Sequence, residues 1–176
     1  MTLLKWNSRL ASSKVIPGKS PLSGHGLFAR EEIKKGETVM VYGGVVVPLN
    51  EIMQYHELSH LGIQVNDNAF LCPHDLKKAV EIGAINHSCD PNCGFKDSVT
   101  VAALRKIKRG EELFLDYAFM ESHRFDFDCL CGSRECRKKV TPEDWKSGKL
   151  QEKYFECFSP YLKEKITRSR FQLANT

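Results

Sequence analysis

Short runs of apolar residues, separated by glycine, proline, asparagine and aspartate, dominate the first two thirds of the chain. The runs read "TVMVY", "VVV", "AFL", "VTVAAL" and "LFLDY". Their length and their β-branched content favour strands over helices. One helix is expected among them, over residues 48–58 ("PLNEIMQYHEL"), which Pro48 or Asn50 can begin. This pattern predicts a compact, mainly β fold with short helices over residues 15–120.

The pattern becomes helical after Asp128. "TPEDW" predicts a helix start, in which Thr141 is the cap and Asp144 completes a capping box, and Gly148 is expected to interrupt that helix. Apolar residues then recur at helical spacing until Ser159, where the following proline forces a boundary and a last helix, "PYLKEKI", begins. We expect a helical C-terminal tail that packs back on the β core. Its expected anchors are Trp145, Tyr154 and Phe158.

Composition narrows the class of protein. The 176 residues, with 41% hydrophobic and 27% charged side chains, are ordinary for one globular core with small appendages. The first residues lack the apolar region of a signal peptide, and no run approaches a membrane span, so we expect an intracellular protein that is cytoplasmic or associated with chromatin. The net charge is +4, and basic runs ("RKIKR", "RECRKK", "KEKITRSR") gather in the second half. They indicate a solvated face or, alternatively, a surface for nucleic acid or an acidic partner.

The cysteines carry the first chemical signal. Seven cysteines in a chain expected to be intracellular argue against a disulfide framework, which leaves metal binding or catalysis. Cys129, Cys131 and Cys136 follow a C-x-C-x4-C spacing that brings three thiolates into one loop, and structural zinc requires a fourth ligand. The other reading of an isolated cysteine is a small buried apolar residue, which we favour for Cys72 and Cys157. The candidates for the fourth ligand are Cys72, Cys89, Cys93 and His87.

Four segments together resemble the SET-domain protein lysine methyltransferases. "SGHGLFAREEIKKGETVMVYGG" looks like the family's opening G-x-G segment, and "INHSCDPNC" resembles its N-H-S-C-x-P-N signature. "VAALRKIKRGEELFLDY" resembles the late strands that end in Asp-Tyr, and "CLCGSREC" resembles the post-SET zinc loop. The resemblance implies a SET fold of small curved β-sheets with a pseudoknot-like topology. The expected parts are an N-terminal segment (1–14), the SET domain (15–120), a post-SET zinc segment (121–140) and a helical extension (141–176).

The resemblance also implies a reaction, the transfer of a methyl group from S-adenosylmethionine to a lysine amine in a protein substrate. Tyr117 matches the catalytic tyrosine, which also contacts the cofactor, and Tyr42 matches a tyrosine that lines the lysine pore. Cys89 matches the fourth ligand of a structural zinc ion held with Cys129, Cys131 and Cys136. The other positions that match cofactor-binding residues are Gly24, His25, Gly26, Leu27, Phe28, Asn86, His87 and Leu130.

Some positions depart from the family's pattern. Gly83-Ala84-Ile85 stands where an Arg-Phe-Ile sequence is common, and Gly44 replaces a glutamate. These changes favour one alternative, a noncatalytic binding module that keeps the fold and the zinc ion. A second alternative is a zinc-stabilised nucleic-acid-binding protein. The basic runs support this alternative, but the motifs do not favour it. If the chain is an enzyme, a histone or another basic chromosomal protein is a candidate substrate.

Overall fold

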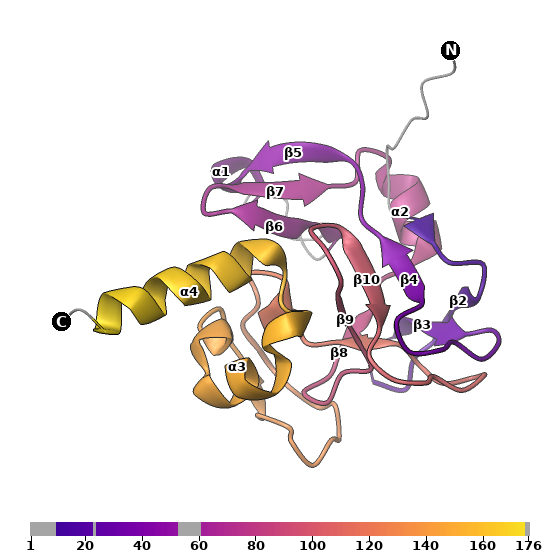
Figure 1. The fold of residues 1–176 in the computed structure, drawn as a ribbon. Coiled ribbons are helices and arrows are strands. Elements are labelled where there is room, and N and C mark those ends of the chain that lie inside the picture. Colours follow the sequence, from indigo (N-terminus) through magenta and orange to yellow (C-terminus); the bar gives the residue numbers. More distant parts are fainter. Residues whose placement is uncertain (1–9, 23, 53–60, 175–176) are drawn as a thin grey trace.

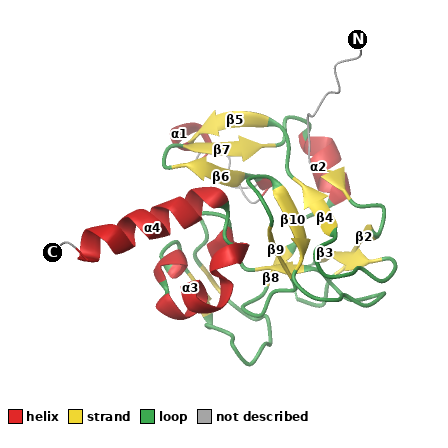
Figure 2. Cartoon of the chain, in the orientation of Figure 1, coloured by secondary structure: helices red, strands yellow, loops and turns green. Residues whose placement is uncertain are grey.

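Small β-sheets form the body of the molecule. The computed structural model describes residues 10–22, 24–52 and 61–174 (Figures 1 and 2). Its largest sheet has six strands in the order β1-β4-β10-β9-β11-β8. These strands are β1 (Leu10–Ala11), β4 (Thr38–Val41), β10 (Thr100–Ala103), β9 (Cys93–Phe95), β11 (Phe114–Leu115) and β8 (Asn86–His87). The smaller sheets pair β2 (Val15–Lys19) with β3 (His25–Ala29), β12 (Phe127–Asp128) with β13 (Lys139–Val140), and β5 (Val45–Pro48) with β7 (Ala69–Cys72) and β6 (Ile63–Asn66).

The central sheet has a knot-like crossing. β11 lies between β8 and β9, which are consecutive in the sequence, and it is parallel to both. The buried amide of Asn92 fixes the crossing because its Nδ2 donates to the Glu112 carbonyl at 2.8 Å and its Oδ1 accepts from the Phe114 amide at 2.7 Å. The Asn92 side chain therefore makes the kind of hydrogen bonds to the backbone that a neighbouring strand would make. This crossing brings the "INHSC" and "LDY" segments side by side.

The predicted strands are confirmed, with one difference. "LFLDY" contributes only two residues to β11, because Asp116 then caps a 3₁₀ turn, η2 (Tyr117–Phe119), through a 3.0 Å bond from the Ala118 amide to its carboxylate. A side-chain cap this close to the strand competes with the ladder. Tyr117 therefore lies at the start of a turn and not in a strand.

The helices of the first two thirds differ from the expectation. α1 (Leu49–Ile52) confirms the start of the helix expected over 48–58, whose remainder lies outside the described residues. A second helix, α2 (Leu76–Ile82), was not predicted. Its ends carry ordinary signals: Asp75 accepts from the Lys78 amide at 2.9 Å, and Gly83 has a φ of 87° and donates to the last carbonyls. These caps would have identified it, although Ala79 is its one buried residue.

The helical tail packs on the core as expected, but its first helix was placed wrongly. Thr141 bonds the Asp144 side chain at 2.8 Å, and only a 3₁₀ turn follows, η3 (Asp144–Lys146). Gly148 does not interrupt a helix; it begins α3 (Gly148–Tyr154), which Ser147 caps. A second 3₁₀ turn, η4 (Phe155–Cys157), precedes the predicted boundary at Ser159, whose hydroxyl accepts from the Leu162 amide at 3.4 Å in α4 (Pro160–Ala174).

The anchors of the tail are the aromatic residues that the sequence suggested. Phe158 is fully buried and Trp145 nearly so, and the Phe119 ring lies 4.8 Å from the Phe158 ring and 5.5 Å from the Tyr154 ring, centroid to centroid. Full burial of one such side chain contributes about 1.5–3 kcal/mol. The tail is thus part of the same core as the central sheet. In Figure 1, α4 runs outward from this contact to the end of the chain.

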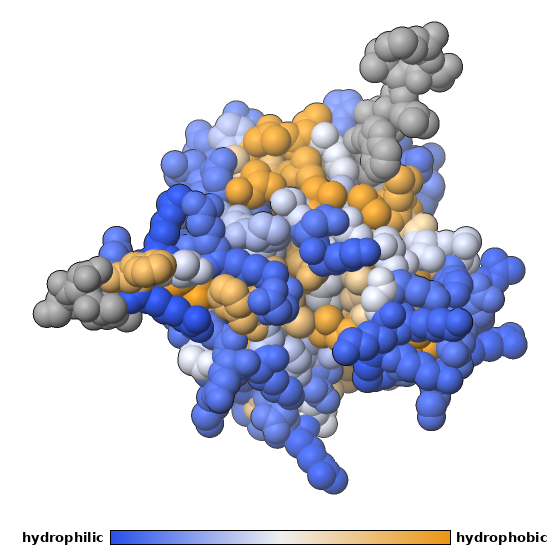
Figure 3. Space-filling model, viewed as in Figure 1, coloured by the Kyte–Doolittle hydropathy of each residue, from blue (hydrophilic) through white to orange (hydrophobic). Residues whose placement is uncertain are grey.

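The surface is largely hydrophilic, as Figure 3 shows from the side of α3 and α4. Apolar side chains gather above them over the three-stranded sheet, where Val45 and Val46 of β5 are 45% and 64% exposed. Within the part of the chain that the structure describes, no helix combines the length and the apolar character required to span a membrane.

Candidate functional site

One large cavity gathers most of the residues that the sequence singled out. Its volume is about 860 Å³, which is within the range of about 300–1,000 Å³ usual for small-molecule sites. Its walls come from the β2–β3 hairpin, the end of α2, the start of β8, the turn η2 and the cysteine loop. The predicted site residues among the described ones that line it are Gly24, His25, Gly26, Asn86, His87, Tyr117, Cys129, Leu130 and Cys131.

The glycine segment approaches a buried polar network. The Asn86 Nδ2 donates to the His25 carbonyl at 2.9 Å and to Glu112 Oε1 at 2.8 Å, and the Ser20 hydroxyl donates to Glu112 Oε2 at 3.0 Å. A Cβ on Gly26 would lie 2.2 Å from Glu112 Oε1 and 2.8 Å from the Asn86 Nδ2. Position 26 therefore requires glycine. The role of Glu112 was not predicted, because a Gly-Glu-Glu sequence in a turn resembles an ordinary solvated loop.

Both ring nitrogens of His87 contact other groups of the protein. Its Nδ1 accepts from the Tyr117 amide at 3.2 Å, and its Nε2 lies 3.3 Å from the Cys89 Sγ. Burial lowers the pKa of His87 to about 4, so the ring is neutral and its single proton is on Nε2, facing the sulfur. The Tyr117 hydroxyl donates to the Ile85 carbonyl at 3.2 Å. The imidazole thus joins the turn that carries Tyr117 to the cysteine cluster.

An aromatic cluster covers Tyr117. The ring centroid of Phe125 lies 4.3 Å from that of Tyr117, Phe127 lies at 6.0 Å, and His87 lies edge-on at 5.3 Å. Phe125 and Phe127 also line the cavity. Such a surface is apolar and disfavours an ammonium relative to the neutral amine, although ring faces still attract cations. The sequence analysis missed both phenylalanines; the alternation in "RFDFD" just before the cysteine loop is the signal that could have indicated them.

A buried ion pair lies next to this aromatic cluster. Arg124 and Glu121 form an ion pair, with side chains only 5% and 1% exposed, and the Arg124 Nη2 also donates to the Gly62 carbonyl at 3.3 Å. The guanidinium carbon lies 4.2 Å from the Phe70 ring centroid and 5.6 Å from that of Phe125. The pair therefore connects the three-stranded sheet to the wall of the cavity.

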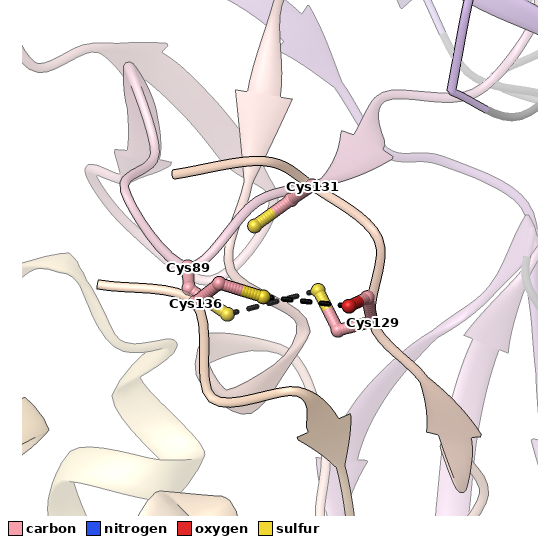
Figure 4. A group of neighbouring side chains, drawn as sticks. All are labelled: Cys89, Cys129, Cys131 and Cys136. Atoms are coloured by element: carbon pink, nitrogen blue, oxygen red, sulfur yellow. Dashed lines mark hydrogen bonds between the residues drawn. The ribbon is translucent and has the colours of Figure 1, made fainter. Parts of the chain in front are cut away.

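Four cysteines converge beside the cavity. The Sγ atoms of Cys89, Cys129, Cys131 and Cys136 lie within 4.8 Å of one another, although Cys89 is 40 residues from Cys129 in the sequence (Figure 4). Zinc–sulfur bonds of about 2.3 Å in a tetrahedron place the sulfurs about 3.8 Å apart. The Cys89 and Cys129 sulfurs are 3.8 Å apart. The cluster has the donor type, number and spacing that Zn²⁺ prefers. The remaining described cysteines lie outside it: Cys72, Cys93 and Cys157.

The pKa values of the cysteine thiols indicate which of them ionise at neutral pH. Burial raises the pKa of Cys129 to about 11 and raises that of Cys89 as well. At Cys131 burial acts in the same direction, but hydrogen bonds from the Cys89 backbone and from Ser133 outweigh it, and its pKa falls to about 6. Cys89 and Cys129 therefore remain thiols at neutral pH in the absence of a metal ion. A bound divalent cation would supply the charge that four adjacent thiolates need.

The charge of the cavity suits a positive ligand. Two carboxylates, Glu81 at the end of α2 and Asp128 in β12, are among the described residues that line it, and these residues include no lysine or arginine. Leu130 lies between Cys129 and Cys131 and is 80% exposed, so an apolar side chain stands at the edge of the cavity. The site combines apolar walls with a net negative charge, which does not favour a phosphate backbone.

Apart from the metal ligands Cys89 and Cys136, three predicted site residues are not among the described residues that line the cavity. Leu27 is fully buried in the core, and the Phe28 ring lies over Gly18 of the neighbouring strand. The Tyr42 side chain is buried and its ring stacks on Phe95 with centroids 6.3 Å apart. Any contact of Leu27 and Phe28 with a cofactor would come from their backbone, and the role of Tyr42 at a lysine pore stays a prediction.

Comparison with known proteins extends this picture. The SET-domain family matches residues 24–118, more than half of the chain. Histone-lysine N-methyltransferase trithorax of Drosophila virilis is 32% identical over 134 residues, which cover 68% of this chain and 3% of the relative. Histone-lysine N-methyltransferase 2B of Homo sapiens is 33% identical over 133 residues, which cover 68% of this chain and 5% of the relative. The H3 lysine-4 specific histone-lysine N-methyltransferase of Schizosaccharomyces pombe is 33% identical over 149 residues, which cover 77% of this chain and 16% of the relative.

Solved structures are similar over a shorter stretch. A humanized mutant of the Chaetomium thermophilum Polycomb Repressive Complex 2, bound to an inhibitor, is 28% identical, with a TM-score of 0.46 and coverage of 61% of this chain and 15% of that one. The chain spans only a small part of the length of these relatives. The family match and the sequence identity over two thirds of the chain nevertheless agree with the four motifs. The protein belongs to the SET-domain family.

Proposed function

We propose that the protein transfers a methyl group from S-adenosylmethionine to the side-chain amine of a lysine in a protein substrate. The observation that carries the proposal is the convergence of Gly26, Asn86, Tyr117 and the cysteine loop on one cavity with negative charge and aromatic walls. When bound, S-adenosylmethionine supplies an electrophilic methyl group on a positively charged sulfur. The positively charged sulfonium suits the carboxylates and ring faces described above, and the apolar ring surface suits the neutral substrate amine.

The cofactor would lie against the glycine segment and Asn86. Gly24 and Gly26 present backbone without side chains at the cavity wall, which allows a ligand to approach closely. Asn86 is held by its bonds to the His25 carbonyl and to Glu112, so its position is set before a ligand arrives. His87 has no uncommitted ring nitrogen for a cofactor, so its contribution would come from its backbone and from the face of its ring.

Tyr117 would orient the substrate amine. The Ile85 carbonyl accepts from its hydroxyl, which fixes the direction of that group, and Phe125 packs against its ring. A free lysine has a pKa of about 10.4, and an apolar aromatic wall favours the neutral amine that can attack. Holding the amine in line with the methyl group replaces a bimolecular encounter, which is the main contribution a protein can make to such a displacement. The role of Tyr42 in this channel is part of the proposal.

A structural zinc ion would complete the site. We assign it to Cys89, Cys129, Cys131 and Cys136, whose spacing fits a tetrahedron. Two of these thiols, Cys89 and Cys129, need a cation to ionise at neutral pH. The hairpin of β12 and β13 encloses the loop, which supports treating residues 121–140 as a separate post-SET segment and 141–176 as a helical extension. The ion would hold Leu130 at the cavity edge.

The substrate class is less sharply indicated than the reaction. The relatives are histone-lysine N-methyltransferases, and a cavity with net negative charge suits a basic peptide, so a histone or another basic chromosomal protein is our first candidate. Such a substrate would make the protein intracellular. The chain covers 3% and 5% of the length of these two relatives, so their substrates are transferred here only as a proposal.

The basic runs do not strengthen the nucleic-acid alternative. Most of their lysines and arginines are already paired with carboxylates, and a paired cation releases few counterions when a phosphate approaches. Examples are Arg105 with Glu111, Lys106 with Glu32, Lys139 with Asp126 and Lys165 with Asp67.

The proposal is tested by incubating the zinc-replete protein with S-adenosylmethionine and a panel of histones and total cell protein. Mass spectrometry would then locate methyl groups on individual lysines. Methylated lysine that requires both protein and cofactor supports the enzyme. Cofactor binding without transfer to any substrate would favour a noncatalytic binding module that retains the cofactor. Absence of cofactor binding by a folded, zinc-replete sample contradicts the enzyme and leaves the noncatalytic module.

A further inference from the structure

Arg137 makes an unusual set of contacts directly after the last cysteine of the loop. Its Nη1 and Nη2 donate to the two carboxylate oxygens of Asp116 at 2.6 and 2.8 Å, and its Nε donates to Asp144 Oδ2 at 2.8 Å. The Asp116 side chain is fully buried and that of Arg137 is 19% exposed. A buried carboxylate requires such a partner.

Asp116 in turn controls the position of Tyr117. It directly precedes Tyr117, and the same Oδ1 that Arg137 contacts also accepts from the Ala118 amide at 3.0 Å, which caps the turn η2. A cap of this kind fixes the backbone at the start of a turn. Because Tyr117 is the first residue of η2, the direction of its side chain follows from the position of Asp116.

A second connection runs parallel to this one. The Arg137 amide donates to the Cys89 Sγ at 3.4 Å, and the same sulfur lies 3.3 Å from the His87 Nε2. The opposite nitrogen of His87 accepts from the Tyr117 amide. The backbone at Tyr117 is therefore held to the cysteine cluster through His87 and through Asp116 and Arg137.

The backbone after Arg137 also requires support. Lys138 has a φ of 67°, and it is the one residue other than glycine with a positive φ in the described part of the chain. Its carbonyl accepts from the Cys129 amide at 2.7 Å, which closes the loop. A left-handed conformation costs roughly 1–2 kcal/mol in a residue with a side chain and persists where neighbouring contacts enforce it. The contacts of Arg137 and the bond from the Cys129 amide lie on either side of this residue.

We propose that Arg137 is a positioning residue for Tyr117, so that the cysteine loop acts on the catalytic geometry through the Arg137–Asp116 bond pair as well as by forming a wall. This inference rests on the proposed function in one respect, which is that Tyr117 is the residue that orients the amine. Arginine is needed because its planar fork binds both carboxylate oxygens of Asp116 while its Nε reaches Asp144. A lysine at this position retains the charge and cannot reproduce the fork.

The test compares Arg137→Lys with the matched control Asp144→Asn. Asp144→Asn weakens the bond between the Arg137 guanidinium and residue 144, which is not part of the connection to Tyr117. The two bonds from Arg137 to Asp116 are retained. Four quantities are measured on the whole chain: kcat, KM for S-adenosylmethionine, zinc content, and the ¹⁹F spectrum of 3-fluorotyrosine inserted at position 117. The ¹⁹F spectrum reports the surroundings of Tyr117 without any reaction, so it remains informative if the proposed methyl transfer is not found.

For Arg137→Lys we expect kcat to fall by roughly ten- to a hundredfold, since a displacement of about 1 Å can cost that much, with KM and zinc content unchanged. Its ¹⁹F resonance should shift or broaden. Asp144→Asn should match the wild type in kcat and in the ¹⁹F spectrum. A wild-type kcat and ¹⁹F resonance in Arg137→Lys would overturn the proposal, as would equal effects of the two variants.

A second variant covers a failure of Arg137→Lys to fold. Asp116→Asn keeps an oxygen that can cap the Ala118 amide and removes the charge that binds the guanidinium. With zinc still bound, the proposal predicts the same change in the ¹⁹F resonance of position 117. An unchanged resonance in a folded Asp116→Asn protein would overturn the proposal even if its turnover were reduced.

Discussion

Replacing Gly26 by alanine should damage the site far more than the size of a methyl group suggests. The new Cβ would lie 2.2 Å from Glu112 Oε1 and 2.8 Å from the Asn86 Nδ2, whereas unstrained carbon contacts are about 3.5–4.0 Å. To accommodate it, the Glu112 carboxylate has to move away and lose its bonds to Asn86 and Ser20. Overpacking costs about 1–3 kcal/mol, and a buried polar group left unpaired costs about 1–3 kcal/mol more. We therefore expect the free energy of unfolding to fall by roughly 3–5 kcal/mol.

Gly24→Ala in the same motif is the control. Gly24 has a φ of 60°, and no heavy atom of the described residues lies within 4 Å of the place that an added Cβ would take. The left-handed backbone is therefore what opposes the substitution, at a cost of about 1–2 kcal/mol. Urea unfolding of the zinc-replete proteins, followed by circular dichroism, gives both free energies. Calorimetric titration with S-adenosylmethionine should show that the Gly26 variant also loses affinity, because Asn86 is displaced.

The double variant Gly26→Ala with Glu112→Ala tests the cause. If the methyl group acts by displacing the carboxylate, removing that carboxylate makes the two losses less than additive. Equal losses of stability for Gly24→Ala and Gly26→Ala, or strict additivity with Glu112→Ala, would refute the reasoning that the buried network dictates glycine at position 26.

Three further predictions concern other parts of the structure. A strong zinc chelator should make four additional thiols reactive toward a thiol reagent and reduce the melting temperature; no change in thiol count would contradict the metal assignment. Trp145→Phe should cost at least 2 kcal/mol less in unfolding free energy than Trp145→Ala, because the indole Nε1 is buried without a hydrogen-bond partner among the described residues and phenylalanine removes that donor; similar losses would contradict this account. Glu121→Ala should lower stability by about 3–5 kcal/mol, since it leaves the buried guanidinium of Arg124 without the Glu121 carboxylate, and a loss below about 1 kcal/mol in urea unfolding would show that water compensates the charge.

The sequence predicted those parts of the site that are encoded locally. The spacing of Cys129, Cys131 and Cys136 brings three sulfurs into one loop whatever the rest of the fold does. The fourth ligand was open among four candidates on spacing alone, and the resemblance to a family indicated Cys89, which the structure places 3.8 Å from Cys129, sulfur to sulfur. The knot-like crossing that brings them together depends on pairing between distant strands, which no local pattern contains.

The residues that sequence reasoning missed have side chains that look ordinary in isolation. Arg137 stands in a basic run typical of a solvated face, and Glu112 stands in a charged turn. Glu112 is buried and Arg137 half-buried because they face partners far away in the sequence, Asn86 for the glutamate and Asp116 for the arginine. Secondary-structure prediction failed where capping residues outweighed periodicity. Only Ala79 of α2 is buried, but the helix has clear capping signals, and the helix expected at Thr141 is replaced by side-chain bonds.

The measurement that tests the central claim most directly is the rate of methyl transfer by wild type and by Tyr117→Phe, with S-adenosylmethionine affinity measured on the same samples. The account predicts labelled methyl groups on lysine with the wild type, and a rate reduced by about a hundredfold or more in Tyr117→Phe with cofactor affinity within about twofold of the wild type. Equal rates for the two proteins, or no transfer by a wild type that is folded, zinc-replete and supplied with a full panel of basic proteins, would contradict it.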